Sequence, residues 1–204
     1  MSELTEMYER IRVCPLCDLS KSRTNAVPGE GPDNAKIMLI GEAPGFHEDR
    51  QGRPFVGAAG KYLDELLGTI GIKREQVYIA NVIKCRPPQN RDPLPEELAA
   101  CKPYIDKQIE LISPKVIITI SRFAMVPWFP DKKISDIHGT PKKFGSRVVL
   151  PMYHPAAALH QPSLKRVIEE DFKKIPQILK EIGNLKVEAE EKNEPPAKQL
   201  NMFG

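Results

Sequence analysis

The sequence predicts a three-layer α/β/α fold with a mostly parallel, four-stranded central sheet. Two observations support this prediction: short apolar runs typical of strands buried on both faces recur along the chain, and segments with helical spacing separate them. The predicted strands are 35–41, 76–85, 115–120 and 147–152. Strands that alternate with helices in this way form a parallel sheet covered by helices on both faces.

The predicted helices fill the intervals around these strands. In the segment 59–71, Leu63, Leu66, Leu67 and Ile70 recur at helical spacing. The polar stretch before the first strand, rich in proline and glycine, is expected to be a loop. Further helices are expected over 3–13, 95–111 and 163–182, with a short one around Phe123.

Size and composition indicate one domain followed by a tail. A chain of 204 residues, 41% hydrophobic and 28% charged, can bury one core and is short for two, so residues 1–183 are expected to form a single domain. From residue 184 the sequence turns polar and loses apolar periodicity, so 184–204 is expected to be a disordered tail. No apolar run suits a membrane span and no targeting pattern begins the chain, so we expect a cytoplasmic protein, and a monomer.

The charge pattern is compatible with binding to a polyanion. The net charge of +3 decides little, because many ordinary enzymes share it. Three local basic clusters together fit a surface that follows phosphates, although a solvated face would explain any one of them. The clusters are Lys84, Arg86 and Arg91; Lys142, Lys143 and Arg147; and Lys165 with Arg166.

The cysteines of the chain indicate one metal site. Its four cysteines are Cys14, Cys17, Cys85 and Cys101. A C-x2-C turn can direct two thiolates at one ion, and two more thiolates complete a sulfur shell that suits zinc or an iron–sulfur cluster. Spacing alone does not choose between the two. Disulfides are disfavoured, because the expected compartment is reducing.

The unusual segments of the chain all follow predicted strands. They are GEAPG (41–45), KCRPPQNR (84–91), SRF (121–123) and YHPAA (153–157). In a parallel sheet, ligands bind beyond the carboxyl ends of the strands, where these segments meet. The sequence therefore predicts a binding or catalytic site at this edge of the sheet.

Four motifs, together with the cysteines, resemble family 4 uracil-DNA glycosylases, the iron–sulfur enzymes of bacteria and archaea. The motifs are GEAPG (41–45), GRPFVG (52–57), NVIKCRPPQNR (81–91) and HPAA (154–157). The resemblance spans about residues 8–182, which would then be the catalytic domain. It implies a base excision repair hydrolase that flips uracil out of single- or double-stranded DNA, hydrolyses the N-glycosidic bond and leaves an abasic site. It also implies that the four cysteines ligate a 4Fe-4S cluster.

The resemblance assigns roles to four side chains. Phe55 matches the residue that stacks on uracil, and Glu48 the residue that occupies the place of the thymine methyl group. Asn81 matches the residue that separates uracil from cytosine, because a carboxamide accepts from N3–H while it donates to O4. His154 is the candidate donor to uracil O2, where negative charge develops. A core phenylalanine, a surface carboxylate, a strand-ending asparagine and a structural histidine are the alternatives.

The residue that orders the attacking water is less defined. Family 1 enzymes carry an aspartate in the first motif, where this sequence has Ala43. Glu42 and Asn90 are the candidates that remain for this role. The backbone amides from Gly41 through Ala43 to Gly45 are expected to contact uracil O2 or a phosphate, as successive amides do in anion-binding turns.

Three further expectations concern partners and rival functions. The terminal peptide from Gln199 to Phe203 resembles the short peptides with which DNA repair proteins bind a sliding clamp, and an unstructured tether suits such a partner. Leu159 is the candidate wedge for the gap left by a flipped base. The rival interpretations are a noncatalytic iron–sulfur module that binds nucleic acid and a glycosylase stabilised by zinc. Phe55, Asn81 and His154 together argue against the first, because binding alone requires none of them.

Overall fold

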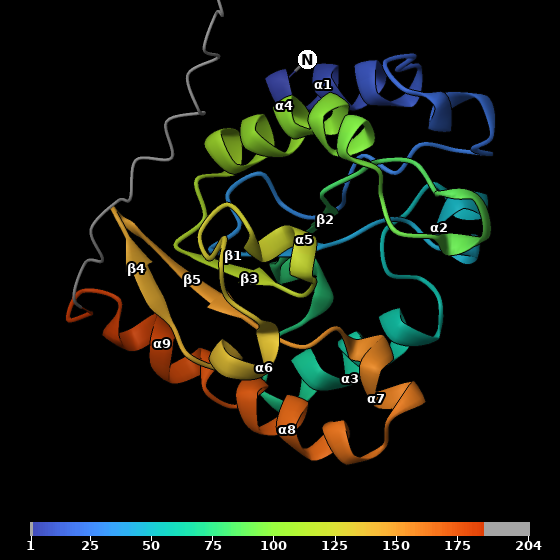
Figure 1. Ribbon diagram of the computed structural model, residues 1–204. Helices are drawn as coiled ribbons and strands as arrows, with labels where there is room; N and C mark the ends of the chain where they lie inside the picture. The colour runs from blue at the N-terminus through green and yellow to red at the C-terminus, as the bar shows by residue number, and fades with distance from the viewer. Residues whose placement is uncertain (1, 186–204) are drawn as a thin grey trace, which may run out of the picture.

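The computed structural model describes residues 2–185 of the chain as a central sheet between two layers of helices (Figure 1). The sheet has the strand order β2-β1-β3-β5-β4. Its first four members in that order run parallel, and β4 pairs antiparallel with β5. The strands are β1 (Ile37–Gly41), β2 (Tyr78–Asn81), β3 (Val116–Thr119), β4 (Lys142–Phe144) and β5 (Arg147–Pro151). The predicted α/β class is confirmed, whereas the predicted count of four strands is wrong.

The additional strand, β4, is a short edge strand. It is joined to β5 by a two-residue turn of Gly145 and Ser146, and Gly145 has a φ of +56°, a value that favours glycine. The side chains of β4 are all half-buried, so the strand has neither an apolar run nor a buried face. A hydrophobicity pattern therefore does not reveal it.

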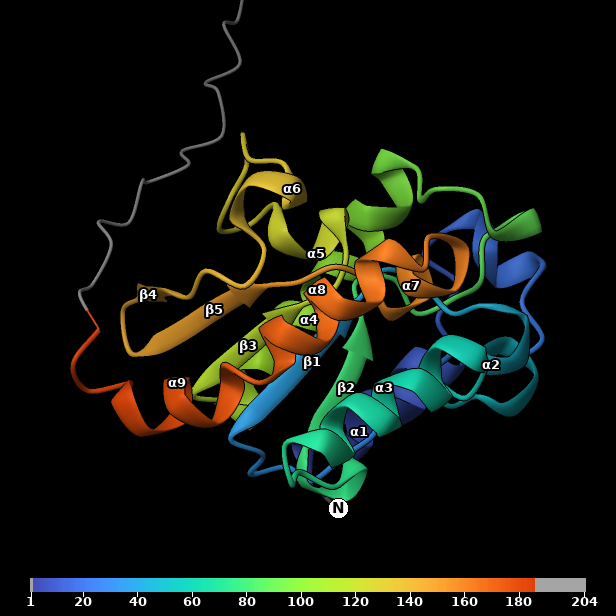
Figure 2. The ribbon, with the colours of Figure 1, turned by 90° about the horizontal axis from the view of Figure 1, so that it is seen from below.

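Two helical layers cover the sheet. One face carries α1 and α4, and Figure 2 shows α3, α8 and α9 crossing the opposite face. Each layer buries its own hydrophobic cluster, with Met7, Ile11 and Ile105 on the first face and Leu63 and Phe172 on the second. The helices are α1 (Glu3–Arg12), α2 (Phe46–Gln51), α3 (Ala58–Thr69), α4 (Pro95–Ile112), α5 (Arg122–Met125), α6 (Ile134–Ile137), α7 (Pro155–His160), α8 (Ser163–Phe172) and α9 (Ile175–Glu181). Three 3₁₀ turns add η1 (Asp18–Lys21), η2 (Arg74–Gln76) and η3 (Pro88–Asn90).

The last predicted helix is two helices in the structure. α8 ends at Phe172 and α9 begins at Ile175, with Pro176 in its first turn. Proline lacks the N–H that would continue the ladder from the preceding helix, so the break falls just before it. Within residues 2–185, no helix is both long and apolar enough to cross a membrane.

The two loops that follow β1 and β2 lie side by side. The N–H of Val82 donates to the carbonyl of Gly41 at 3.0 Å, and that of Ile83 donates to the carbonyl of Glu42 at 3.1 Å. β2 therefore ends at Asn81, earlier than predicted, and the chain beyond it follows the loop after β1. This pairing brings the GEAPG and KCRPP segments to the same edge of the sheet.

Candidate functional site

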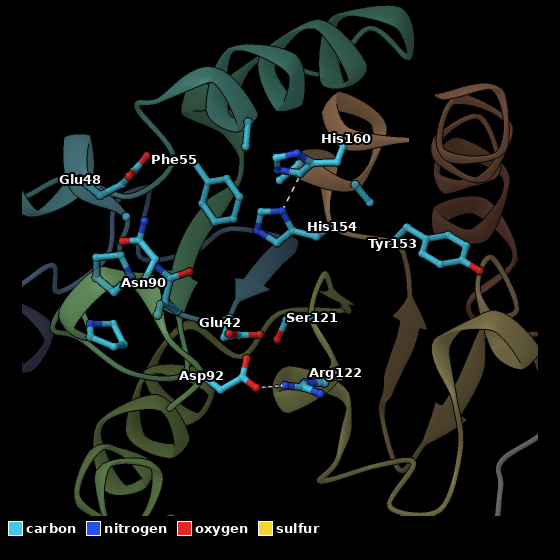
Figure 3. Close-up of a pocket in the computed structure, with 18 of the residues that line it drawn as sticks. Glu42, Glu48, Phe55, Asn90, Asp92, Ser121, Arg122, Tyr153, His154 and His160 are labelled. Carbon is cyan, nitrogen blue, oxygen red and sulfur yellow. Dashed lines mark hydrogen bonds and ion pairs between the residues drawn. The ribbon is translucent and has the colours of Figure 1, made fainter. Parts of the chain in front are cut away.

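A cavity of about 620 Å³ opens at the carboxyl ends of the parallel strands. Figure 3 shows Phe55 and His154 at one wall, with Asn90, Glu42 and Asp92 across from them. The predicted site residues that line this cavity are Glu42, Ala43, Gly45, Glu48, Phe55, Asn81, Asn90 and His154. The structure therefore brings together, in one space, residues from the four motifs.

Gly41, the remaining predicted site residue, lies underneath this wall. A Cβ atom built on Gly41 would stand 2.4 Å from the Asn81 Oδ1 atom and 2.8 Å from two atoms of the Phe55 ring. Any side chain at position 41 would therefore displace both groups. Because Gly41 has no side chain, it leaves the space that these two groups occupy.

Asn81 ends β2 with its side chain buried, at 1% exposure. Its Oδ1 atom has no hydrogen-bond partner among the described residues. Its backbone carbonyl accepts from the Lys84 Nζ atom at 2.8 Å. A buried carboxamide oxygen without a partner is costly, so a ligand that offers an N–H to it would gain binding free energy.

His154 stacks beside Phe55, with ring centroids 5.5 Å apart and an interplanar angle of 25°. It is also the N-cap of α7, because its Nδ1 atom accepts from the Ala156 N–H at 3.0 Å. Burial lowers the pKa of His154 to about 4, and the charge of Glu48 opposes part of this shift. The ring is therefore neutral near pH 7 with its proton on Nε2, where it can donate to a ligand.

Glu48 is held in place by backbone amides. Its Oε1 atom accepts from the N–H groups of Val56 at 2.9 Å and Gly57 at 2.8 Å, at the start of α3. Its Oε2 atom lies close to Gly45: a Cβ atom built on Gly45 would stand 2.8 Å from it. The carboxylate is thus a fixed part of the cavity wall and not a mobile surface group.

Glu42 and Asn90 lie across the cavity and differ in their partners. Burial and then the charge of Asp92 raise the pKa of Glu42, and the charge of Arg122 opposes them. No described residue hydrogen-bonds the Glu42 carboxylate. In contrast, the Asn90 Oδ1 atom accepts from the Arg86 Nε atom at 2.7 Å.

The cavity also contains residues that sequence reasoning did not assign. Asp92 and Arg122 form an ion pair at its rim (Figure 3). Ser121 and Arg122 belong to the SRF segment after β3. Their position at the end of a strand was the sequence feature that could have indicated them as site residues. His160, which has no motif context, lies one helical turn after Ala156 and Ala157 on α7 and shares their face. The remaining unassigned lining residues are Pro44, Ala59, Pro87, Arg91, Ile134, Met152 and Tyr153.

Lys84 contradicts the expectation that the KCRPPQNR loop presents a row of cations to phosphates. It is buried at 1% exposure, and its Nζ atom donates to the Asn81 carbonyl and to the Gln108 Oε1 atom at 2.6 Å. Arg91 forms a paired contact with Glu97, at 2.9 and 2.6 Å. These two side chains anchor the loop to α4 and β2. Leu159, the candidate wedge, is 51% exposed on α7.

The four cysteines come from three elements on the α1 and α4 side of the sheet. Cys14 and Cys17 follow α1, Cys85 follows β2 and Cys101 lies in α4. All four are free thiols, with Cys85 and Cys101 buried. The donor set consists of sulfur alone, which suits soft metals and iron–sulfur clusters.

The thiols interact with one another electrostatically. Burial raises the pKa of Cys101 to about 11, and the charges of Cys85 and Cys17 act in the same direction. The Arg23 Nη1 atom donates to the Cys85 Sγ atom at 3.1 Å and to the Cys14 carbonyl at 2.8 Å. In the described part of the chain, no group of three or more histidine, cysteine or acidic residues is arranged to hold a metal ion. The cysteines are the residues suited to a thiolate-bound group, and a guanidinium that offsets negative charge lies beside them.

Comparison with known proteins identifies the family. The chain matches the uracil DNA glycosylase superfamily over residues 28–180. It is 47% identical over 188 residues to a type-4 uracil-DNA glycosylase of Sulfurisphaera tokodaii, with 87% of this chain and 86% of the relative covered. Type-4 uracil-DNA glycosylases of Archaeoglobus fulgidus (47%; 87% and 94% covered) and Thermotoga maritima (45%; 89% and 97%) are similarly related. The expected family is confirmed: the chain belongs to the uracil DNA glycosylase superfamily and, within it, to the type-4 uracil-DNA glycosylases.

Proposed function

We propose that this protein is a monofunctional DNA repair glycosylase that excises uracil from single- or double-stranded DNA and leaves an abasic site. The observation that carries the proposal is the buried Asn81 Oδ1 atom, which lacks a partner among the described residues and lies close to the Phe55 ring, beside which His154 stacks. Uracil N3–H is a donor that would satisfy this oxygen. A nucleotide must leave the base stack to reach such a cavity, so the enzyme acts on a flipped base.

Asn81 and Phe55 would recognise the flipped base. The Phe55 ring offers an apolar face on which a pyrimidine can stack. The Asn81 carboxamide would accept from N3–H and donate to O4 of uracil. Cytosine presents an acceptor at N3 and a donor at N4. With the carboxamide oriented as in the structure, cytosine would leave both of its groups unpaired, and a site with buried polar groups rejects such a ligand strongly.

Glu48 would exclude thymine. A hydrophobic pocket discriminates poorly against one extra methyl group, whereas a fixed side chain in the place of that methyl excludes it by contact. The two amides that hold the Glu48 carboxylate support this role, because a mobile side chain would move aside.

His154 would stabilise the leaving group. As the bond between C1′ and N1 breaks, negative charge collects on uracil O2 while the sugar becomes cationic. A donor aimed at O2 acts where charge develops, which is where interactions accelerate the reaction. Because the His154 pKa is about 4, the ring is neutral and keeps its Nε2 proton, so it would donate a hydrogen bond. The backbone amides from Gly41 to Gly45 would assist from the neighbouring turn.

Glu42 would order the attacking water. Its carboxylate is half-buried, and no described residue hydrogen-bonds it, whereas the Asn90 oxygen accepts from Arg86. The water oxygen would add to C1′ as the uracil anion departs, and the proton that it loses would pass to Glu42. Asn90, which lies on the same side of the cavity as Glu42 (Figure 3), would help to hold the water or the sugar.

Cys14, Cys17, Cys85 and Cys101 would ligate a 4Fe-4S cluster, which would tie α1, the loop after β2 and α4 together. The all-sulfur donor set and the hydrogen bond from Arg23 to Cys85 support this assignment. The cluster would supply structural order. Cys85 lies four residues from Asn81 along the chain, so a held Cys85 would also fix the loop that follows Asn81.

Three further expectations belong to this proposal. The protein would act as a monomer in the cytoplasm, and its terminal peptide from Gln199 to Phe203 would bind a DNA sliding clamp. That peptide lies outside the described residues. Deleting residues 199–204 should leave uracil release unchanged and abolish binding to a purified clamp; retained clamp binding would contradict this part.

A uracil-release assay tests the proposed function. The purified protein is incubated with oligonucleotides that carry a single uracil, thymine or cytosine at one position, in single- and double-stranded form. We expect free uracil and an alkali-labile abasic site from the uracil substrates alone. Asn81→Ala should lose the activity, whereas Asn184→Ala, at an exposed position in the segment after α9, should keep it. Binding of these oligonucleotides without any base release would favour the noncatalytic rival instead.

A further inference from the structure

Phe55 has a strained backbone. Its φ is +51°, in the left-handed region that an aromatic residue rarely adopts. Such a conformation costs free energy and persists only where the surroundings hold it. The direction in which the Phe55 ring leaves the chain depends on this backbone angle. Something must therefore hold the backbone at this position.

Arg74 provides this constraint from outside the cavity. Its Nη1 atom donates to the Phe55 carbonyl at 3.1 Å, and its Nη2 atom donates to the Pro54 carbonyl at 2.5 Å. The planar guanidinium thus holds two consecutive carbonyls at once. Arg74 belongs to η2, between α3 and β2, and it is neither part of the four motifs nor in contact with the cavity.

Arg74 is itself fixed by two carboxylates. Its Nε atom donates to the Glu30 Oε1 atom at 3.1 Å, and its Nη1 atom also donates to the Asp64 Oδ1 atom at 3.0 Å. Its side chain is 18% exposed. Glu30 additionally pairs with Arg53, at 2.6 and 3.0 Å. The guanidinium therefore uses all three nitrogens in a geometry that a lysine cannot reproduce.

The Phe55 carbonyl is also enclosed by α3. A Cβ built on Gly60 would stand 1.9 Å from the Phe55 oxygen, so the first turn of the helix lies directly against it. The carbonyl therefore has both Gly60 and Arg74 as close neighbours. If Arg74 were lost, the guanidinium side of this enclosure would open, and the peptide could relax toward negative φ.

We propose that Arg74 is a positioning residue that holds the Phe55 ring beside His154 and over Gly41, ready to stack on the flipped base. The expected effect of Arg74 on catalysis rests on the proposed function. Its expected effect on the position of the Phe55 ring does not. A role limited to overall stability is the competing explanation, and the experiment separates the two.

The first measurement is a double-mutant cycle in single-turnover uracil release. Arg74→Ala should lower the maximal rate on the order of tenfold, because a displaced stacking ring misplaces the base. The affinity for an oligonucleotide without uracil should stay unchanged. In a Phe55→Ala background, the same Arg74→Ala change should have little further effect, because there is no ring left to position. A role limited to stability would reduce the rate by the same factor in both backgrounds, and that result would overturn the proposal.

Arg53→Ala is the matched control. It removes a guanidinium from the same Glu30 carboxylate but gives no hydrogen bond to Pro54 or Phe55, so its rate should match that of the unmodified protein. Arg74→Lys keeps the charge beside Glu30 and Asp64, and it replaces Arg74→Ala in the same measurement if Arg74→Ala does not fold. Since one ammonium cannot hold both carbonyls, Arg74→Lys should show a partial loss with the same dependence on Phe55. A full wild-type rate for a folded Arg74→Ala would also overturn the proposal.

The second measurement does not depend on catalysis. The Phe55 ring current acts on the stacked His154 ring, so the imidazole proton resonances of His154 should shift in Arg74→Ala and remain in place in Arg53→Ala. Unchanged His154 resonances in Arg74→Ala would refute the positioning role even if the protein proved inactive on uracil. Conversely, shifted resonances in a protein that releases no uracil would reject the proposed function while the role of Arg74 stands.

Discussion

The Asn81 side-chain oxygen lies so close to Gly41 that a methyl group on Gly41 would stand 2.4 Å from it. The two residues are register partners at the last pair of β1 and β2. The same missing methyl group leaves room for the Phe55 ring. Two recognition groups thus converge on the one position of β1 that has no side chain.

Gly41→Ala is expected to abolish most activity. The added methyl group would push the Asn81 carboxamide and the Phe55 ring out of place, and both are proposed to hold the base. We expect a loss on the order of 10²-fold in the single-turnover rate of uracil release. The affinity for DNA without uracil should change little, because such DNA offers no uracil to bind against Asn81 and Phe55. A rate near that of the unmodified protein would show that the close approach has no role in the reaction.

Gly68→Ala provides a matched control for this substitution. Gly68 lies inside α3, and a Cβ built on it meets nothing within 4 Å. Because alanine favours the helix over glycine, the free energy of unfolding should rise by about 0.5–1 kcal/mol. Thermal or denaturant unfolding checks this, and uracil release should be unaffected.

Asn81→Asp is expected to weaken the discrimination between uracil and cytosine. A carboxylate still accepts from N3–H of uracil but no longer donates to O4, and it can accept from the amino group of cytosine. Release of uracil should fall, and the ratio of uracil to cytosine release should fall with it. Asn81→Ala removes both polar groups, so it should lose uracil release without gaining any on cytosine. An unchanged base preference in Asn81→Asp would exclude the proposed role of the carboxamide.

Sequence patterns predict the parts of this fold that bury large apolar faces. The strands around Leu39 and Ile117 are covered on both sides, so their apolar runs are unbroken and visible. β4 escapes such reasoning, because an edge strand of half-buried residues is stabilised by pairing with β5 and by the turn at Gly145. Pro176 indicates the break between α8 and α9 in the sequence. The apolar spacing of the segment nevertheless favoured a prediction of one continuous helix.

The site was predictable where the chemistry is local to a motif. Phe55 lies in the short motif between α2 and α3 and His154 in the motif after β5, and the structure places both in one cavity. Arg74 had no such signal: its two carbonyl contacts depend on a backbone angle at Phe55, nineteen residues away, that no residue pattern indicates. Lys84 misled for a related reason, because a lysine in a polar loop is ordinarily exposed, whereas tertiary packing against α4 buries it here.

His154 is expected to remain neutral through the acidic range in which an ordinary histidine becomes charged. Its pKa in the folded protein is about 4, below the ordinary value of 6.5, because burial disfavours the imidazolium. Its imidazole protons should therefore titrate by NMR with a midpoint near 4. A midpoint near 6.5 would show that the ring is solvated and can act as a cation.

The same shift makes stability depend on pH. Between the two pKa values, the unfolded chain binds a proton at position 154 that the folded chain does not. The contribution of His154 to stability is therefore complete above pH 6.5 and is lost as the pH falls toward 4. The free energy of unfolding should rise with pH across this window, and His154→Asn should reduce the slope. His154→Asn should also lower the rate of uracil release on the order of 10²-fold, as expected when a donor to a developing anion is lost.

The cysteines are expected to bind iron and sulfide rather than zinc. The purified protein should absorb visible light and contain iron and acid-labile sulfide in the ratio of a 4Fe-4S cluster. Cys101→Ser should remove the visible band and lower the midpoint of thermal unfolding, because α4 would lose its tie to the loop after β2 and to the turn after α1. Leu16→Ser adds a hydroxyl at an exposed position between Cys14 and Cys17 without touching a thiol, so it should retain both iron and colour. Four thiolates also suit zinc, which the cysteine spacing leaves open as an alternative. A colourless protein with one zinc ion per chain would therefore contradict the assignment of an iron–sulfur cluster.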